Sequence, residues 1–433
     1  MSGGVEHDRG AAPHAHDLER AGTNADAVDG VVPARVVQGR SVDDVRAIVR
    51  RATDDGHALI ASGRGRHLAL GEPPGRLDLL LRLDRLDRVH EHQAADMTVN
   101  VATGCTLGEI DRVLARAGQW LPLDPPAPDE TTVGGLIAAN LSGPLRASQG
   151  TVRDLLLGLS WIGPGGELVS AGGRVVKNVA GYDLAKAHVG ALGTLGVLVE
   201  ATFKVRPRPP CERALVLGCD DPRTALDVAL AARDAVDPAW LEIASAGVLA
   251  GVDAPFAVVV GWLGLAAEVT DAEQRVLDAV ESSATRTLAS VDGAPARALR
   301  ARLGGFALEP AAAMLRAATL PGALGELLAE VARAAADAGT PLRCVAHAAN
   351  GVARIAVADP AAVTTLVAAL RPRLAARGGS LVVERAAPAV KHALQPVGGV
   401  FGDPGAGRAL MRRLKEAFDP GASFAPGRFV AGI

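Results

Sequence analysis

The stretch GGRVVKNVAGYDLAKAHVGALGTLGVLVEATFKVRPRP, residues 172–209, decides how this sequence is interpreted. Its first part is rich in glycine and contains Tyr182, the only tyrosine of the 433 residues. The apolar, β-branched run VLVEATF that follows predicts a strand. The prolines after it predict the end of a domain, because proline continues neither a helix nor a central strand. Glycine lets a backbone approach another molecule closely. We therefore expect the backbone of this stretch to run close to a bound ligand, and we expect a domain to end at the prolines that follow.

Length and composition limit the classes of protein. A chain of 433 residues, 49% hydrophobic and 21% charged, is expected to form two or three soluble globular domains. A net charge of −3 gives no basis for binding nucleic acid or an anionic membrane. No apolar run reaches the about 18 residues that a membrane span needs, and the N-terminus lacks the apolar core of a secretion signal. We expect a cytoplasmic protein without direct membrane insertion, with any membrane association made through partner subunits.

Four cysteines occur in the sequence, and none forms a CxxC pair or a closely spaced ligand set. They are Cys105, Cys211, Cys219 and Cys344. An iron–sulfur cluster or zinc site within this chain is therefore not expected, and no metal is predicted. We interpret the cysteines as small buried side chains in a reducing compartment.

Helical and strand patterns alternate along the first half of the chain. A helix is expected over 41–56 with Ser41 as its N-cap, followed by a buried strand over 57–61. Proline-rich residues 205–213 predict a domain boundary, beyond which alanine-rich helices alternate with apolar strands up to a C-terminal helix over 403–421. We predict a disordered tail over 1–28, a first domain over 29–209 and a second domain over 210–433.

Three glycine-rich segments are candidates for ligand contact. They are SGRGRHLALG (62–71), DETTVGGLIAANLSG (129–143) and the opening stretch itself. A strand that runs into such a loop presents several backbone N–H groups to one point, which suits an anion. The Rossmann spacing G-x-G-x-x-G and the Walker loop are both absent. Three separated loops indicate one long ligand, such as a dinucleotide, held on a different fold.

The order of these segments carries a resemblance to a known family. Together with LPLDPP (121–126), they resemble the flavin-binding domain of vanillyl-alcohol-oxidase-type (PCMH-type) FAD enzymes, and among these the FAD-binding subunits of bacterial glycolate oxidase. The resemblance runs from about residue 31 to 209, and residues 410–429 resemble the end of an FAD-linked oxidase C-terminal domain. It implies an α+β protein: a two-lobed FAD-binding domain followed by an α/β cap domain. It also implies FAD, bound non-covalently.

The resemblance implies which residues contact FAD. The first loop would cradle the pyrophosphate, residues 123–126 and 131–135 would line the flavin and ribityl chain, and residues 193–199 would bring amides along the cofactor. The expected cofactor-binding residues are Ser62, Gly63, Arg64, Gly65, Arg66, His67, Pro125, Thr131, Thr132, Gly134, Gly135, Asn140, Ser142, Gly150, Val197 and Val199. Lys177, Asn178 and Asp183 are candidates for polar contacts, and Tyr182 is favoured as a packed core aromatic over a flavin contact.

The second domain departs from its catalytic relatives. Hydroxy-acid dehydrogenases of this family carry H-x-G-D-G-N-x-H and a later E-H-G, which serve metal binding and proton removal. The corresponding segments here are HAANGVAR (347–354) and GGSLVVERAA (378–387). Arginine neither ligates a metal nor accepts a proton at neutral pH, so the catalytic residues stay unassigned. The weak candidates are His347, Glu384, Arg354 and Arg385.

The resemblance therefore favours an accessory subunit: the FAD-binding subunit of a glycolate oxidase (dehydrogenase) complex, which oxidises glycolate to glyoxylate. This subunit would relay electrons, and its partners would be a catalytic flavoprotein D-type subunit and an iron–sulfur F-type subunit. Two alternatives stay open. One is a free-standing FAD-dependent dehydrogenase of D-lactate type, in which Arg354 and Arg385 grip the substrate carboxylate. The other is a non-catalytic assembly subunit.

Overall fold

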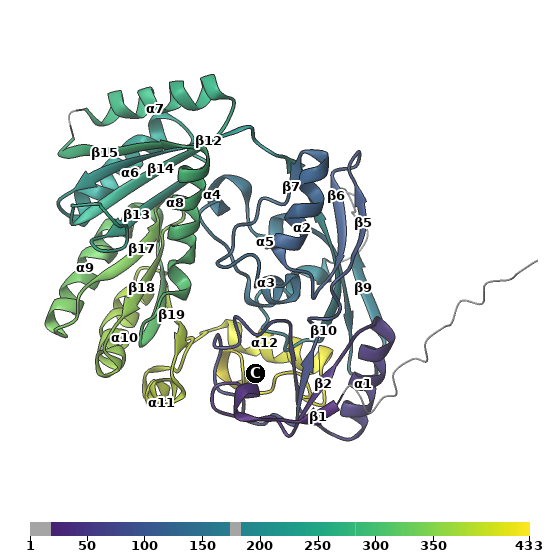
Figure 1. Ribbon diagram of the computed structural model, residues 1–433. Helices are drawn as coiled ribbons and strands as arrows, with labels where there is room; N and C mark the ends of the chain where they lie inside the picture. Colours follow the sequence, from purple (N-terminus) through teal and green to yellow (C-terminus); the bar gives the residue numbers. More distant parts are fainter. Residues whose placement is uncertain (1–18, 174–182, 282) are drawn as a thin grey trace, which may run out of the picture.

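A computed structural model gives the fold and describes residues 19–173, 183–281 and 283–433. Two lobes lie side by side, joined by the proline-rich connection that precedes residue 211 (Figure 1). Lys177, Asn178 and Tyr182, which the sequence singled out, lie outside the described residues. Among the described residues, no helix combines the length and the apolar character needed to cross a membrane.

The first lobe begins with a four-stranded sheet in the order β1-β2-β4-β3, in which β2, β4 and β3 run parallel. Its elements are β1 (Glu19–Ala21), β2 (Arg35–Gln38), α1 (Val42–Asp54), β3 (Leu59–Ser62) and β4 (Leu79–Arg82). Helix α1 starts as predicted, because the Ser41 hydroxyl accepts a hydrogen bond from the Asp44 amide at 3.1 Å and the Asp44 carboxylate accepts one from the Ser41 amide. Its apolar face buries Val45 and Val49 against the sheet.

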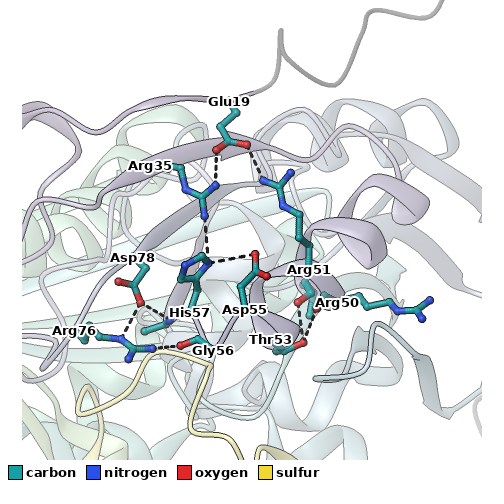
Figure 2. A network of polar contacts seen from close by, with 12 residues as sticks. Glu19, Arg35, Arg50, Arg51, Thr53, Asp55, Gly56, His57, Arg76 and Asp78 are labelled. Atoms are coloured by element: carbon teal, nitrogen blue, oxygen red, sulfur yellow. Dashed lines mark hydrogen bonds and ion pairs between the residues drawn. The ribbon is translucent and has the colours of Figure 1, made fainter.

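The predicted tail is too long, because residues 19–28 are ordered. Strand β1 pairs antiparallel with β2, and the Glu19 carboxylate accepts hydrogen bonds from Arg35 at 2.7 Å and from Arg51 of α1 at 2.8 Å. Figure 2 shows these contacts and the neighbouring one between Arg35 and His57, at 3.2 Å. Ion pairs to strand β2 and to helix α1 thus hold a segment that the sequence predicts to be disordered.

An antiparallel sheet in the order β5-β6-β10-β8-β9 forms the other half of the first lobe. Its apolar face packs on helices α2 and α3, and α2 buries Leu107, Ile110 and Leu114 at helical spacing, as its sequence predicts. The elements are β5 (Val89–Gln93), β6 (Thr98–Ala102), α2 (Leu107–Leu114), α3 (Val133–Ala139), α4 (Arg146–Gln149), β8 (Leu156–Ile162), β9 (Leu168–Gly172) and β10 (Val197–Lys204). Short strands β7 (Gln119–Trp120) and β11 (Arg206–Pro207) pair beside it.

The second lobe is built on an antiparallel eight-stranded sheet in the order β15-β12-β14-β13-β17-β18-β16-β19. The strands are β12 (Cys211–Cys219), β13 (Trp240–Ser245), β14 (Phe256–Gly264), β15 (Thr285–Asp292), β16 (Ala313–Ala318), β17 (Arg343–His347), β18 (Val352–Val357) and β19 (Ser380–Ala386). The helices are α6 (Pro222–Ala235), α7 (Ala266–Val280), α8 (Gly293–Gly305), α9 (Leu324–Asp337) and α10 (Pro360–Ala375).

The two faces of this sheet have different neighbours. Leu215 and Leu217 of β12 share a core with α6, α7, α9 and α10. Val216, between them, belongs to a core that includes α8 and also Trp120 and Leu145 of the first lobe. Since successive side chains of a strand point to opposite faces, one face of the sheet is covered by helices and the other is directed toward the first lobe.

The end of the chain returns to the first lobe. After β19, helices α11 (Pro388–Ala393) and α12 (Gly407–Phe418) lead to a segment that pairs with β3. The Leu59 amide donates to the Ser423 carbonyl and the Ala425 amide donates to the Leu59 carbonyl, both at 2.8 Å. In Figure 1 this C-terminal part lies beside β1, β2 and β10. The domain boundary between residues 209 and 210 stays a prediction, although the described chain does cross back after β19.

Candidate functional site

A cleft in the first lobe forms where the loop after β3, the start of α3 and the loop before β10 meet. These are the three segments that the sequence marked as glycine-rich. The predicted cofactor-binding residues that line it are Ser62, Gly63, Arg64, Gly65, Arg66, His67, Thr132, Gly134 and Gly135. Gly193 and Gly196, from the opening stretch, line it as well.

The loop after β3 presents free amides. Within the residues that the structure describes, the backbone N–H groups of Arg64, Gly65, Arg66 and His67 donate no hydrogen bond. Gly65 has φ of +76°, a left-handed conformation that favours glycine and turns the chain sharply. Arg64 and Arg66 are exposed and Gly65 and His67 are half-buried, so these amides are open to an acceptor from outside the protein. A run of donors without protein partners at one loop is suited to an anion such as a diphosphate.

The second segment packs directly against this loop. A Cβ atom on Gly63 would lie 2.3 Å from the Thr132 hydroxyl oxygen, so only glycine permits the contact. That hydroxyl caps α3 by accepting a hydrogen bond from the Gly135 amide at 3.3 Å, as the sequence predicts for Thr131 or Thr132. The Gly134 amide donates to the Thr103 carbonyl at 2.8 Å. The close packing of these elements gives the cleft a fixed wall.

Thr131 supports the cleft from behind. Its hydroxyl donates to the Pro126 carbonyl at 2.8 Å and lies 3.1 Å from Nε2 of His67, which therefore carries the proton in this contact. Burial, followed by the charge of Arg66, lowers the pKa of His67 to about 4. The imidazole is thus neutral at neutral pH and acts as a fixed wall of the cleft.

The side chains of β10, the strand after the third segment, alternate between the cleft and the buried core. Leu198 of β10 lines the cleft, whereas the side chains of Val197 and Val199 belong to the buried core between the two sheets of the lobe. Successive side chains of a strand point to opposite faces, so the side chain of Leu198 faces the cleft, whereas Val197 and Val199 are expected to contact the cofactor through backbone amides. A role for their backbone stays a prediction.

Four further predicted contacts lie away from this cleft, so their part in cofactor binding stays a prediction. Pro125 lines a separate groove between the lobes. Asn140 ends α3 in a left-handed conformation, with φ of +49°. Ser142 accepts a hydrogen bond from Arg146 at 3.3 Å, and Gly150 makes a turn with φ of +86°.

The residues that line the cleft and that sequence reasoning missed include Thr103, Leu192 and Arg428. Thr103 directly follows β6, and its place at the end of an apolar, β-branched run is the available signal for it. Leu192 adopts φ of +52° between the glycines of the third segment, which no pattern of residue types announces. Arg428 belongs to the C-terminal segment that resembles the end of an FAD-linked oxidase domain, so that resemblance was the signal.

A second set of polar residues lies on the face of the large sheet that is directed toward the first lobe, and the strand register brings them together. Glu242 of β13 lies directly opposite His347 of β17, and Arg316 of β16 lies opposite Arg354 of β18. Glu384 occupies an irregularity of β19 between the pairs that Met314 and Leu315 make, and such bulges re-aim side chains. We call these five residues the cap cluster.

Both ring nitrogens of His347 are engaged. Nδ1 lies 2.7 Å from Oε1 of Glu242, and Nη1 of Arg354 donates to Nε2 at 3.0 Å. Because a guanidinium only donates, Nε2 must be the accepting nitrogen and Nδ1 carries the proton. Arg354 also donates through Nε to Glu384 at 2.9 Å, and Arg316 pairs with the other oxygen of Glu384 at 2.9 Å. His347 thus has no lone pair left for a substrate proton.

Burial sets the protonation states of the cap cluster. It lowers the pKa of His347 to about 3, helped by the charges of Arg354 and Arg146, and it raises the pKa of Glu242 well above its ordinary value. Within the described chain, Oε2 of the fully buried Glu242 has no hydrogen-bond partner. Burial also acts to raise the pKa of Glu384, but Arg354 and Arg316 outweigh it, so the pKa of that carboxyl is lowered.

Arg385, the last catalytic candidate, is directed elsewhere. Its guanidinium donates to the carbonyl of Leu308 at 3.2 Å and to that of Glu309. The structure therefore brings together His347, Arg354 and Glu384 but not Arg385. In the described ranges, no three or more histidines, cysteines or acidic residues are grouped so as to hold a metal ion.

Comparison with known proteins assigns the first lobe. Residues 33–172 match the family model described as FAD binding domain. The glycolate oxidase subunit GlcE of Escherichia coli (strain K12) is 38% identical over 168 residues, which are 39% of this chain and 47% of that protein. The glycolate oxidase subunit GlcD of Bacillus subtilis (strain 168) is 29% identical over 185 residues, 43% of this chain and 39% of that protein. The chain thus spans less than half the length of these curated relatives in the matched regions.

Solved structures share the fold of both lobes. p-Cresol methylhydroxylase with substrate bound superposes with a TM-score of 0.71 at 16% identity, covering 92% of this chain and 88% of that one. Alkyldihydroxyacetonephosphate synthase gives a TM-score of 0.66 at 17% identity, covering 93% and 80%. The unpaired amides and the glycine contacts of the cleft fit the diphosphate of FAD. Residues 33–172 thus match the FAD binding domain model, and the chain shares an α+β, two-lobed fold with these solved structures.

Proposed function

We propose that this chain is the FAD-binding subunit of a glycolate-oxidising complex and relays electrons within it. Supporting this proposal, the relatives of the first lobe include glycolate oxidase subunits. Bound FAD would accept two electrons and pass them on. Oxidation of glycolate to glyoxylate releases two electrons and two protons, so the complex needs a group that removes the hydroxyl proton and a carrier that takes the electrons.

The observation that carries the proposal is the saturation of His347. A general base needs a free lone pair within reach of the proton that it removes. The Nε2 lone pair of His347 accepts from Arg354, and Nδ1 is bonded to Glu242. The cap cluster therefore offers no imidazole base, and we assign proton removal to a partner subunit of D type. An F-type subunit with iron–sulfur centres would receive the electrons, because electrons from FAD need a further carrier.

The free-standing dehydrogenase is less well supported by the same contacts. It needs Arg354 and Arg385 to grip a substrate carboxylate, yet Arg354 already donates to Glu384 and His347. Arg385 donates to two backbone carbonyls. Each arginine would have to give up partners that are half-buried or buried before it could bind a substrate. A non-catalytic assembly subunit would hold FAD only as a structural group or not at all, so activity that requires the FAD-loaded chain separates our proposal from it.

Copurification from the native host tests the proposal. The chain should copurify with a D-type flavoprotein and a cysteine-rich iron–sulfur chain, with one FAD per copy of this chain. Acid precipitation should release the yellow colour into the supernatant, because the FAD is held non-covalently. Glycolate-dependent reduction of an artificial acceptor should require this chain loaded with FAD. A colourless chain, colour retained in the pellet, or full activity without this chain would each contradict the proposal.

A further inference from the structure

The loop that follows the amide-rich segment is held through five consecutive carbonyls by two buried cations. Nζ of Lys391 donates to the carbonyls of Ala69 at 2.6 Å and Gly71 at 2.8 Å. Arg428 donates to the carbonyls that alternate with these, namely those of Leu68, of Leu70 at 2.7 Å and of Glu72 at 2.8 Å. We call Lys391, Arg428 and their shared partner Asp29 the C-terminal latch.

The backbone of the C-terminal segment adds to this grip. The Glu72 amide donates to the Arg428 carbonyl at 2.9 Å, and a Cβ atom on Gly71 would lie 2.7 Å from the same carbonyl oxygen. The Glu72 carboxylate in turn accepts the Val400 amide at 2.5 Å. Loop and C-terminal segment are therefore in contact through both side chains and backbone.

The two cations of the latch face two carboxylates. Asp29 accepts hydrogen bonds from Lys391 at 2.8 Å and from Arg428, and the charge of the Glu72 carboxylate also favours the charged form of both. Lys391 is 0% exposed and Arg428 is 3% exposed. The carbonyls that accept from the two side chains satisfy their remaining donors, so both cations are buried with partners.

The latch lies next to the cleft. Leu68, Leu70 and Arg428 line it together with the loop whose amides are unpaired. Residues 64–72 are thus one continuous segment, with free N–H groups at its start and tied carbonyls at its end. Lys391 comes from α11, directly after β19, so the latch also links the second lobe to this segment.

We propose that the C-terminal latch is a positioning device for FAD: Lys391 and Arg428 hold residues 64–72 in the shape that presents their amides to the cofactor's diphosphate. Arg428 and Lys391 act through the loop and are positioning residues. The latch makes the last third of the chain a part of the cofactor site, although the matched FAD-binding domain ends at residue 172. This inference rests on the FAD-binding part of the proposed function and does not need the electron relay.

FAD titration into the apoprotein, followed by flavin fluorescence, tests the latch. We expect Arg428→Met and Lys391→Met to weaken FAD affinity at least tenfold. Arg428→Lys should recover part of that affinity, because an ammonium reaches some of the carbonyls but lacks the planar fork. Arg412→Met removes an exposed arginine from α12 and serves as the matched control, with unchanged affinity expected. Wild-type affinity in Arg428→Met would overturn the inference.

Hydrogen exchange separates positioning from general destabilisation. In Arg428→Met, the amides of Leu68, Leu70 and Glu72, which donate hydrogen bonds, should exchange faster while those of β12 and β14 keep their protection. Faster exchange throughout the chain would reduce the latch to a structural role and overturn the proposal. If Arg428→Met does not fold, Arg428→Lys decides, since unchanged affinity and unchanged exchange there would contradict the inference. A folded wild-type apoprotein that binds no FAD would instead contradict the proposed function.

Discussion

The cleft of the first lobe and the cap cluster of the second lobe differ in how their polar groups are satisfied. In the cleft, four consecutive amides have no acceptor among the described residues. In the cap cluster, His347, Arg354 and Glu384 are bonded to one another. Amides without a protein acceptor are available to a ligand at little cost, whereas the groups of a saturated network must give up partners before they can bind one. The comparison indicates a protein that is prepared to bind a cofactor but not to deprotonate a hydroxy acid.

Breaking the saturated network should have the largest effect on stability. Arg354→Met leaves Glu384 with one cation fewer and His347 without a donor at Nε2, so we expect a loss of about 3–5 kcal/mol in the free energy of unfolding. Arg316→Met is the matched control, since its side chain is 37% exposed and contacts Glu384 alone in the cluster; about 1 kcal/mol or less is expected. Urea titration measures both. Equal, small losses would mean that the cluster is not a coupled network.

Substitution of the glycines that line the cleft should weaken the binding of FAD. Gly65→Val places a β-branched side chain at φ of +76°, which costs about 1–2 kcal/mol and reshapes the amide loop, so FAD affinity should fall at least about 100-fold. Gly251→Val is a matched control in the second lobe at φ of +74°, with the same strain and unchanged FAD affinity. Gly135→Val should weaken binding too, because its side chain would enter the cleft. Normal flavin occupancy in Gly65→Val and Gly135→Val would show that the cradle lies elsewhere.

Lowering the pH should destabilise the protein, because His67 of the cleft and His347 of the cap cluster are neutral in the folded state. The pKa is lowered to about 4 in His67 and to about 3 in His347, mainly by burial. The unfolded chain therefore binds more protons below about pH 6.5, and stability falls as the pH drops from there toward 4. Each histidine contributes up to about 1.4 kcal/mol per pH unit in that window. His67→Gln and His347→Gln should each flatten the dependence of the urea midpoint on pH, and an unchanged slope in both would contradict these pKa shifts.

Removing a helix N-cap should give the smallest change in stability. It compares helix α3, which begins at the cleft, with helix α1. Thr132→Ala and Ser41→Ala each remove a capping hydroxyl and should cost about 1 kcal/mol of stability. Only Thr132 lines the cleft, so only its variant should also weaken FAD binding, by a few-fold. Equal FAD affinity in the two variants would place Thr132 outside the cofactor site.

Local patterns made much of the fold predictable. Ser41 begins its helix, Leu107, Ile110 and Leu114 face the core, and the three glycine-rich segments meet at one cleft. These features depend on short-range periodicity, capping and backbone freedom, which residue types encode directly. The ordered β1 was missed because Glu19 is fixed by Arg35 and Arg51, contacts that its own segment does not announce.

Contacts between residues that are far apart in the sequence could not be predicted from it. The latch joins Lys391 and Arg428 to loop carbonyls more than 300 residues earlier, and no spacing rule connects them. Likewise, the histidine of HAANGVAR was a catalytic candidate by position, and only strand register places Glu242 and Arg354 on its two nitrogens. Whether a polar group is free or committed depends on such pairings, and that distinction decides between a catalytic and an accessory interpretation.

Anaerobic mixing of the isolated, FAD-loaded chain with glycolate tests the central claim most directly. Loss of a positioned base typically costs about 10²–10⁴-fold in rate, so the flavin absorbance should stay that of the oxidised cofactor while the assembled complex turns over. Addition of the D-type and F-type subunits should restore reduction of an artificial acceptor. Rapid bleaching of the isolated flavin by glycolate or D-lactate would contradict the account and identify the chain as a free-standing dehydrogenase.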